Sequence, residues 1–210
     1  MKTNIRPNTK IAAFSMIEMI GVLAVIAILA ALLIPKVFDA INSAKINNTA
    51  SGLNTVKTAV VTHFGKWGAL NCSNGITFPV TDAQAKLYGS NVLVGEKFLD
   101  KPFETKIGTG GCIELVAATA AATTPPDGLG ANYWLSGQGT DPVNETSPAS
   151  MIVQARLFNV AIADAMELSR CIDGPTMSYT DLAVADLKGR VQYKAPVAGV
   201  TDVFVYMESK

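Results

Sequence analysis

The chain has 210 residues, of which 49% are hydrophobic and 16% are charged. Its 17 basic residues balance its 17 acidic ones, so the totals exclude a strongly basic nucleic-acid binder. Three cysteines and one histidine are too few for the zinc frameworks built from paired Cys and His, and a histidine-dependent hydrolase would depend on His63 alone.

The charges are unevenly distributed at the N-terminus. The first 13 residues hold Lys2, Arg6 and Lys10 with no acid, whereas Phe14–Ile34 holds a single charge, Glu18. As a helix, these 21 residues would extend roughly 30 Å, the hydrocarbon thickness of a bilayer. The positive-inside rule then predicts one membrane pass with a cytoplasmic N-terminus and an exported C-terminal part.

A secretory signal peptide and a plain signal anchor are the simpler interpretations of such a start. The apolar stretch is longer than the roughly 7 to 15 residues of a signal-peptide core, and no clear A-x-A cleavage site precedes Pro35. Glu18 also needs an explanation, because a carboxylate inside a membrane helix costs about 2.5 to 3.5 kcal/mol. Cleavage before Phe14 would create an amine within about one helical turn of Glu18, in the same or a neighbouring subunit.

The segment Ala13-Phe14-Ser15-Met16-Ile17-Glu18-Met19-Ile20 resembles the processing signature of type IV pilins and type II secretion pseudopilins. In that family a basic leader is removed before a Phe, which is then N-methylated. A Glu follows four residues later, as Glu18 does here, and a Pro lies further along, as Pro35 does. The residue before the cut is usually Gly, and here it is Ala13. The close resemblance covers about residues 1–60.

The resemblance implies a structural filament subunit and not an enzyme, closer to a pseudopilin than to an adhesive pilin. Its implied partners are a prepilin peptidase and N-methyltransferase, other copies and pilin-like subunits, the inner membrane and the filament assembly platform. The amine at Phe14 would pair with Glu18 of an adjacent subunit. The location implied is the bacterial inner membrane with a periplasmic head, and the filament would lie in the periplasm or at the cell surface. The alternative is an inner-membrane-anchored periplasmic binding domain that is never cleaved.

The expected fold is α+β and pilin-like. We expect a leader over 1–13, a transmembrane half of a stem helix over 14–35, its periplasmic half over 36–66 and a globular head over 67–210. Apolar residues at spacings of 3 and 4 predict the stripe by which the periplasmic half packs on a sheet: Val37, Ile41, Ala44, Leu53, Val56, Val60 and Phe64. Asn47, Asn48 and Thr49 form a polar patch between them. Pro35 should kink or loosen the helix, and Gly65 and Gly68 should end it.

The head should be an antiparallel sheet with one further helix. Short apolar runs between turn residues suggest strands at Asn91–Val94, Ile113–Val116, Tyr133–Leu135, Ser150–Phe158, Gly189–Tyr193 and Val200–Met207, the last two as a closing pair. The spacing over Val160–Cys171 predicts a helix that ends at Asp173-Gly174-Pro175. Ala117–Asp127 is small, polar and proline-containing, as surface loops are.

His63 lies in the last turns of the predicted stem helix, where we expect it to interact with the helix dipole or to face solvent. Many pilins have a disulfide in the head, and the resemblance implies one pair among Cys72, Cys112 and Cys171, with all three pairings open.

We expect no cofactor. Calcium is kept as an alternative, because some pseudopilins hold it in a loop, and Asp127, Asp141 and Glu145 supply oxygens in that region without a regular ligand pattern. Removal of the leader would leave 14 basic and 17 acidic residues, a net charge of −3, so no nucleic acid is expected as a partner.

Overall fold

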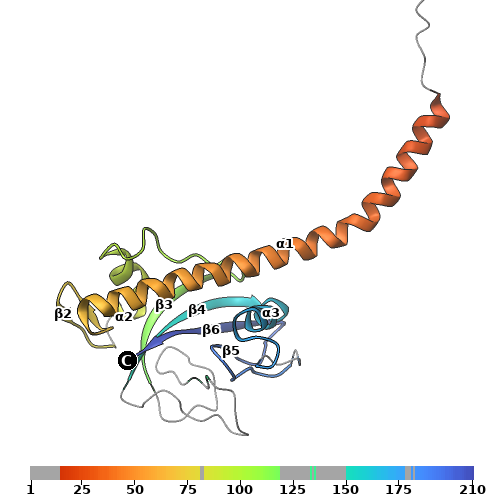
Figure 1. Cartoon of the computed structure of the whole chain (residues 1–210). Helices are drawn as coiled ribbons and strands as arrows, with labels where there is room; N and C mark the ends of the chain where they lie inside the picture. Colours follow the sequence, from red (N-terminus) through yellow and green to blue (C-terminus); the bar gives the residue numbers. More distant parts are fainter. Residues whose placement is uncertain are drawn as a thin grey trace, which may run out of the picture. The chain divides into compact units, whose positions relative to one another are not determined.

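A computed structural model describes residues 15–80, 83–118, 133, 135, 150–177, 181 and 183–210 (Figure 1). The chain divides into two compact units, Met1–Ile41 and Asn42–Lys210. The elements form an α+β arrangement, a long N-terminal apolar helix followed by an antiparallel sheet. The predicted leader, with Ala13 and Phe14, lies outside the described residues, as do the loop positions 119–127.

Helix α1 comprises Met16–Trp67 and continues through Pro35. The helix ends at Trp67 because Gly68 adopts a φ of 72°, a backbone conformation that residues other than glycine rarely adopt. The Gly68 amide donates to the Phe64 carbonyl at 2.7 Å and so satisfies one of the last carbonyls. The predicted helix end is confirmed at Gly68, whereas Gly65, which was also expected to end the helix, lies inside α1.

The part of α1 within the second unit buries one face. Eight side chains of α1 are buried: Ile46, Thr49, Ala50, Leu53, Val56, Ala59, Val60 and His63. This confirms the predicted packing at Leu53, Val56 and Val60. The stripe was wrong at Val37 and Ile41, which are 47% and 44% exposed, and Thr49 of the expected polar patch is buried. Burial therefore begins at Ile46, later than the hydrophobic pattern suggested.

The head is built on a four-stranded antiparallel sheet with the order β3-β4-β6-β5. Its strands are β3 (Gly110–Ala117), β4 (Met151–Ala161), β5 (Val191–Tyr193) and β6 (Val200–Ser209). The predictions at 113–116, 150–158, 189–193 and 200–207 are thus confirmed, including the closing β5–β6 pair. Of the predicted strand at 133–135, Tyr133 and Leu135 are described and neither lies in a strand, whereas residue 134 lies outside the described residues.

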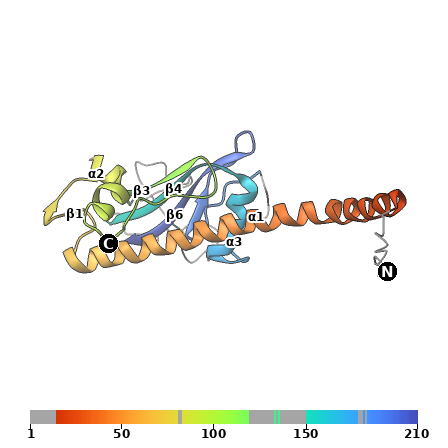
Figure 2. The ribbon, with the colours of Figure 1, turned by 90° about the horizontal axis from the view of Figure 1, so that it is seen from above.

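The two faces of the sheet have separate apolar clusters. Val153, Ala155 and Leu157 of β4 point toward α1 and join its buried residues in the main core. Figure 2 shows this part of α1 running alongside β4 and β6. On the opposite face, Ile152 packs with Val116 and Tyr133. This alternation is the normal two-residue period of a strand.

Helix α3 (Ile162–Asp173) follows β4 directly and ends before Gly174, as predicted. Its last residue is fixed to the sheet, because both oxygens of the Asp173 carboxylate accept backbone N–H groups, one from Arg190 at 2.9 Å and one from Val191 at 2.8 Å. The main core includes Ala165 and Leu168 of this helix.

A small subdomain follows the end of α1. It contains a hairpin of β1 (Cys72–Ser73) and β2 (Ile76–Thr77), helix α2 (Ala83–Lys86) and a single π-helical turn, η1 (Gly89–Val94). The predicted strand at Asn91–Val94 was therefore wrong. A short apolar run cannot be distinguished from a buried helical turn by periodicity. The turn packs closely on β3, since a Cβ on Gly89 would lie 2.9 Å from the Ile113 Cβ.

Candidate functional site on the N-terminal helix

The first half of α1 exposes an unbroken apolar surface. All large apolar side chains from Met16 to Ile34 are between 50% and 83% exposed. Gly21 has no atom within 4 Å of the position a Cβ would take. An apolar helical surface of this length is larger than soluble monomers normally expose. The helix is long and apolar enough to cross a membrane, and none of its most apolar 18-residue window is buried.

Glu18 lies in the first turn of this helix, where its carboxylate meets the start of the backbone. The Ser15 amide donates to Glu18 Oε2 at 3.1 Å. Since the helix begins at Met16, Ser15 occupies the N-cap position and Glu18 the third helical position. The segment Ser15-Met16-Ile17-Glu18 is therefore one half of a capping box. The S-x-x-E pattern was visible in the sequence, but our sequence analysis did not use it.

This local bond accounts for only part of what a buried carboxylate requires. A backbone N–H satisfies one acceptor position and carries only a partial positive charge, to which the helix N-terminus adds its dipole. Neither supplies the full counter-charge that a carboxylate needs in an apolar medium. Of the other positions predicted to take part, Ala13 and Phe14 lie outside the described residues. Pro35 lies inside α1 and has no backbone N–H. The Ala31 carbonyl therefore lacks the donor that a regular helix would give it.

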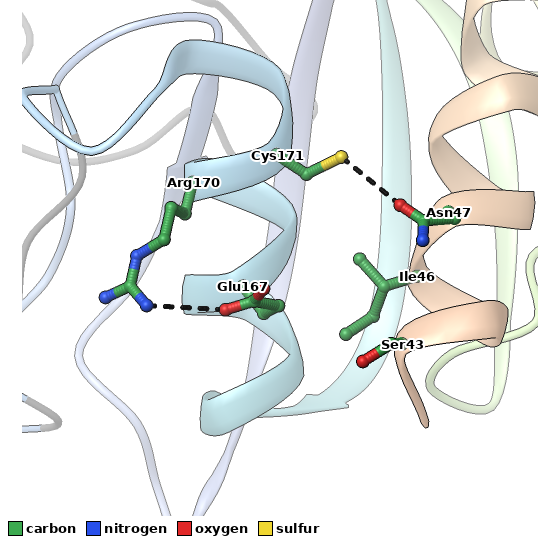
Figure 3. Close-up of a pocket in the computed structure, with 6 residues that line it drawn as sticks. All are labelled: Ser43, Ile46, Asn47, Glu167, Arg170 and Cys171. Atoms are coloured by element: carbon green, nitrogen blue, oxygen red, sulfur yellow. Dashed lines mark hydrogen bonds and ion pairs between the residues drawn. The ribbon is translucent and has the colours of Figure 1, made fainter. Parts of the chain in front are cut away.

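In the second unit, a cavity of about 190 Å³ lies between α1 and α3, lined by Ser43, Ile46, Asn47, Glu167, Arg170 and Cys171 (Figure 3). The Cys171 thiol points toward Asn47 and donates to its Oδ1 at a sulfur–oxygen distance of 3.7 Å. The Arg170 guanidinium points away from α1 and contacts Glu167 Oε2 at 3.5 Å. Both charged side chains are about half exposed, so water screens this pair.

The three cysteines are free thiols in the structure, and the disulfide implied by the resemblance stays a prediction. Cys72 lies on β1, Cys112 on β3 and Cys171 near the end of α3, three different elements of the head. Burial raises the pKa of the Cys112 thiol to about 11, assisted by the nearby Glu114 carboxylate. Cys112 is thus predominantly the unreactive thiol at neutral pH.

His63 is fully buried, so the expectation that it faces solvent or the helix dipole was wrong. Its Nε2 lies 2.9 Å from the Cys72 carbonyl oxygen, and its Nδ1 lies 3.0 Å from the Tyr88 hydroxyl. The ring also makes edge contacts with Tyr88 and Phe98, at centroid distances of 5.7 and 5.3 Å. Because both nitrogens are occupied inside the core, this histidine is not accessible as a base for an external substrate.

No group of three or more His, Cys, Asp or Glu side chains that could hold a metal ion occurs in the described part of the chain. The candidate calcium ligands Asp127, Asp141 and Glu145 fall outside that part. Searches against protein-family models, characterised proteins and solved structures find no match to this chain. The function is therefore inferred from the apolar first half of α1 and from Glu18 within it.

Proposed function

We propose that this chain is a structural subunit of the type IV filament superfamily, made as a prepilin and closer to a type II secretion pseudopilin than to an adhesive pilin. The leader 1–13 is removed between Ala13 and Phe14, and Phe14 is N-methylated. The segment 14–35 then anchors the subunit in the bacterial inner membrane, with the head in the periplasm. The pilin-like fold and the absence of an enzymatic role belong to the same proposal.

The observation that carries this proposal is one carboxylate in the otherwise uncharged, exposed apolar first half of α1, four residues after a Phe that follows a basic leader. In lipid, the exposed side chains of Met16–Ile34 need no protein partner, but the Glu18 charge does. An N-terminal amine at Phe14 of an adjacent subunit supplies that charge. Pairing removes two costs at once, since each ion alone is unfavourable in the bilayer.

The proposal assigns partners by the same reasoning. A membrane-embedded peptidase and methyltransferase must act on Ala13 and Phe14, and the assembly platform must extract the helix as it docks on other subunits. The filament then lies in the periplasm or at the cell surface. The alternative, an uncleaved membrane-anchored periplasmic binding domain, uses the same helix as a permanent anchor and gives Glu18 only its capping role.

The intact mass and N-terminal residue of protein extracted from membranes distinguish these two functions. Processing predicts a chain that starts at methylated Phe14 and lacks a leader of about 1.4 kDa, from roughly 110 Da for each of its 13 residues. A chain that still starts at Met1 would favour the anchored domain and refute the prepilin proposal.

A pair of substitutions at Glu18 separates charge from helix capping. Gln retains the acceptor for the Ser15 amide but carries no charge, whereas Ala has neither the acceptor nor the charge. We expect Glu18→Gln to insert into the membrane at least as well as wild type but to be strongly depleted from filaments. Glu18→Ala should show the same defect. Wild-type incorporation of the Gln variant would show that the charge has no docking role.

A further inference from the structure

His63 connects three segments that are distant in the sequence. From the end of α1 it bonds to Cys72 in the Leu70–Val80 hairpin and to Tyr88 at the start of η1, and Phe98 packs against its ring. We call Leu70–Val80, which contains β1 and β2, the hairpin, and Leu87–Leu99, which contains η1, the π-helical segment. The same side chain thus holds both to the end of α1.

The partners of the ring determine its protonation state. A carbonyl oxygen can only accept, so the Cys72 carbonyl requires a proton on Nε2. The Tyr88 hydroxyl then donates to the unprotonated Nδ1. Both nitrogens of the neutral imidazole and the Tyr88 hydroxyl proton then have hydrogen-bond partners. Protonation of Nδ1 would make the Tyr88 hydroxyl accept instead of donate, and it would place the positive charge of an imidazolium at a fully buried position, which is the cost that opposes it.

The charges around the ring act in opposite directions. Glu96 Oε1 lies 3.9 Å from His63 Nε2 and favours the imidazolium, whereas Lys66 of α1 disfavours it. Burial outweighs both and lowers the pKa of His63 below 6.5. Burial alone would raise the pKa of Glu96, but donation from Trp67 and the Asn74 amide overcomes this and lowers it below 4.5. Tyr88 is the other titratable side chain bonded to the ring, and burial raises the pKa of its hydroxyl well above 10, so it stays neutral.

Glu96 reinforces the same connection from the π-helical segment. Its Oε2 accepts from Trp67 Nε1 at 2.5 Å, at the last residue of α1, and its Oε1 accepts from the Asn74 amide of the hairpin at 3.0 Å. Lys66 lies over the Trp67 ring, 4.5 Å from its centroid. The four-stranded sheet has its own backbone ladder, and none of the residues that form these bonds lies in its strands.

We propose that His63 is a pH-sensitive lock, whose protonation releases the hairpin and the π-helical segment from the end of α1 while the four-stranded sheet remains folded. This inference is independent of the proposed filament function. It gives the head two states, a closed one at neutral pH and a locally opened one in mild acid.

The direction of the pH effect follows from linkage. His63 has a lower pKa in the folded protein than in the unfolded chain, so the unfolded chain binds the proton first as pH falls. The stabilisation is complete above about pH 6.5 and is lost progressively below it, until the pH reaches the folded-state pKa. Glu96 remains ionised above pH 5, because its pKa is lowered below 4.5, so it does not obscure this range.

The test compares the full chain with His63→Gln in detergent, by denaturant unfolding between pH 7.5 and pH 5.0. The chain has one histidine, so this substitution removes all histidine titration. Over this range the unfolding equilibrium constant of wild type should rise by up to about 30-fold more than that of the variant. Hydrogen exchange at pH 5.0 should show the wild-type hairpin and π-helical segment losing protection before β4 and β6.

Tyr88→Phe is the matched control. It removes the hydroxyl beside Nδ1 but leaves the ring and its burial in place, so the pH dependence should remain. Identical pH dependence in wild type and His63→Gln would overturn the proposal. If the Gln variant does not fold, ring nitrogen NMR on wild type decides. Protonation of His63 in the folded chain near pH 6.5 would refute the lock, and an Nε2–H ring that stays neutral well below that pH would support it.

Discussion

The two halves of α1 belong to one continuous helix but have opposite relations to their surroundings. From Met16 to Ile34 the large apolar side chains are all at least half exposed, and the only charge is Glu18. From Asn42 to Trp67 one face is buried in the main core and the other carries Asn, Ser and Thr. Among the described residues, the more hydrophobic half is therefore the one that stays exposed.

This difference shows that hydrophobicity alone does not indicate which part of a helix packs in a protein core. A core requires side chains on one stripe and polar groups elsewhere, so that the helix is soluble on its other side. The second half meets this condition and the first does not. An apolar surface around the whole helix requires an apolar solvent, and a bilayer provides one.

A charge placed in the core should have the largest effect. Val60 is fully buried, so Val60→Asp should destabilise the head by about 3 to 5 kcal/mol or prevent its folding, because an unpaired carboxylate would be buried. Denaturant unfolding of the full chain in detergent measures this. Val61→Asp is the control, since the adjacent side chain is 47% exposed and its replacement should cost less than about 0.5 kcal/mol. Equal losses in the two variants would contradict the assigned burial.

The same change in the first half of α1 should affect insertion and not folding of the head. Val25 is 57% exposed near the middle of the apolar segment. Val25→Asp should disfavour membrane insertion by about 2.5 to 3.5 kcal/mol, which reduces the inserted fraction in a membrane-extraction assay. The unfolding midpoint of the head in detergent should remain that of wild type, and Val25→Leu should change neither property. A head destabilised by Val25→Asp would mean that this half of α1 has a protein partner.

The smallest expected effect comes from a buried hydroxyl, that of Thr49, in the second half of α1. Thr49 is buried, donates to the Lys45 carbonyl at 2.9 Å and accepts from the Lys106 amide at 3.2 Å. Thr49→Val leaves that amide without an acceptor and should destabilise the head by about 1 kcal/mol. Thr55 bonds only to the Ser51 carbonyl and is exposed, so Thr55→Val should be nearly neutral. Unfolding midpoints of the two variants provide the measurement, and an equal shift would show that the bond to Lys106 contributes nothing.

Sequence patterns were most successful where one local rule determines the structure. Gly68 ends α1 because its positive φ suits glycine, and alternation identified β5 and β6, whose alternate apolar residues are buried in the main core. The run Asn91–Val94 was misjudged because its three apolar residues, Val92 to Val94, fit a strand and a buried turn equally well. The capping interaction of Ser15 with Glu18 needed only a local motif and could have been predicted.

The sequence by itself determined the long helix, its apolar first half, the position of its single charge and the antiparallel strands, because these depend on neighbours a few residues apart. Only the tertiary structure decided that packing on α1 begins at Ile46, that Thr49 is buried, and that the three cysteines are free thiols on separate elements. It also decided the environment of His63, whose partners Cys72, Tyr88 and Glu96 lie 9 to 33 residues further along the chain. No local sequence pattern predicts these contacts, because they depend on how segments distant in the sequence pack together.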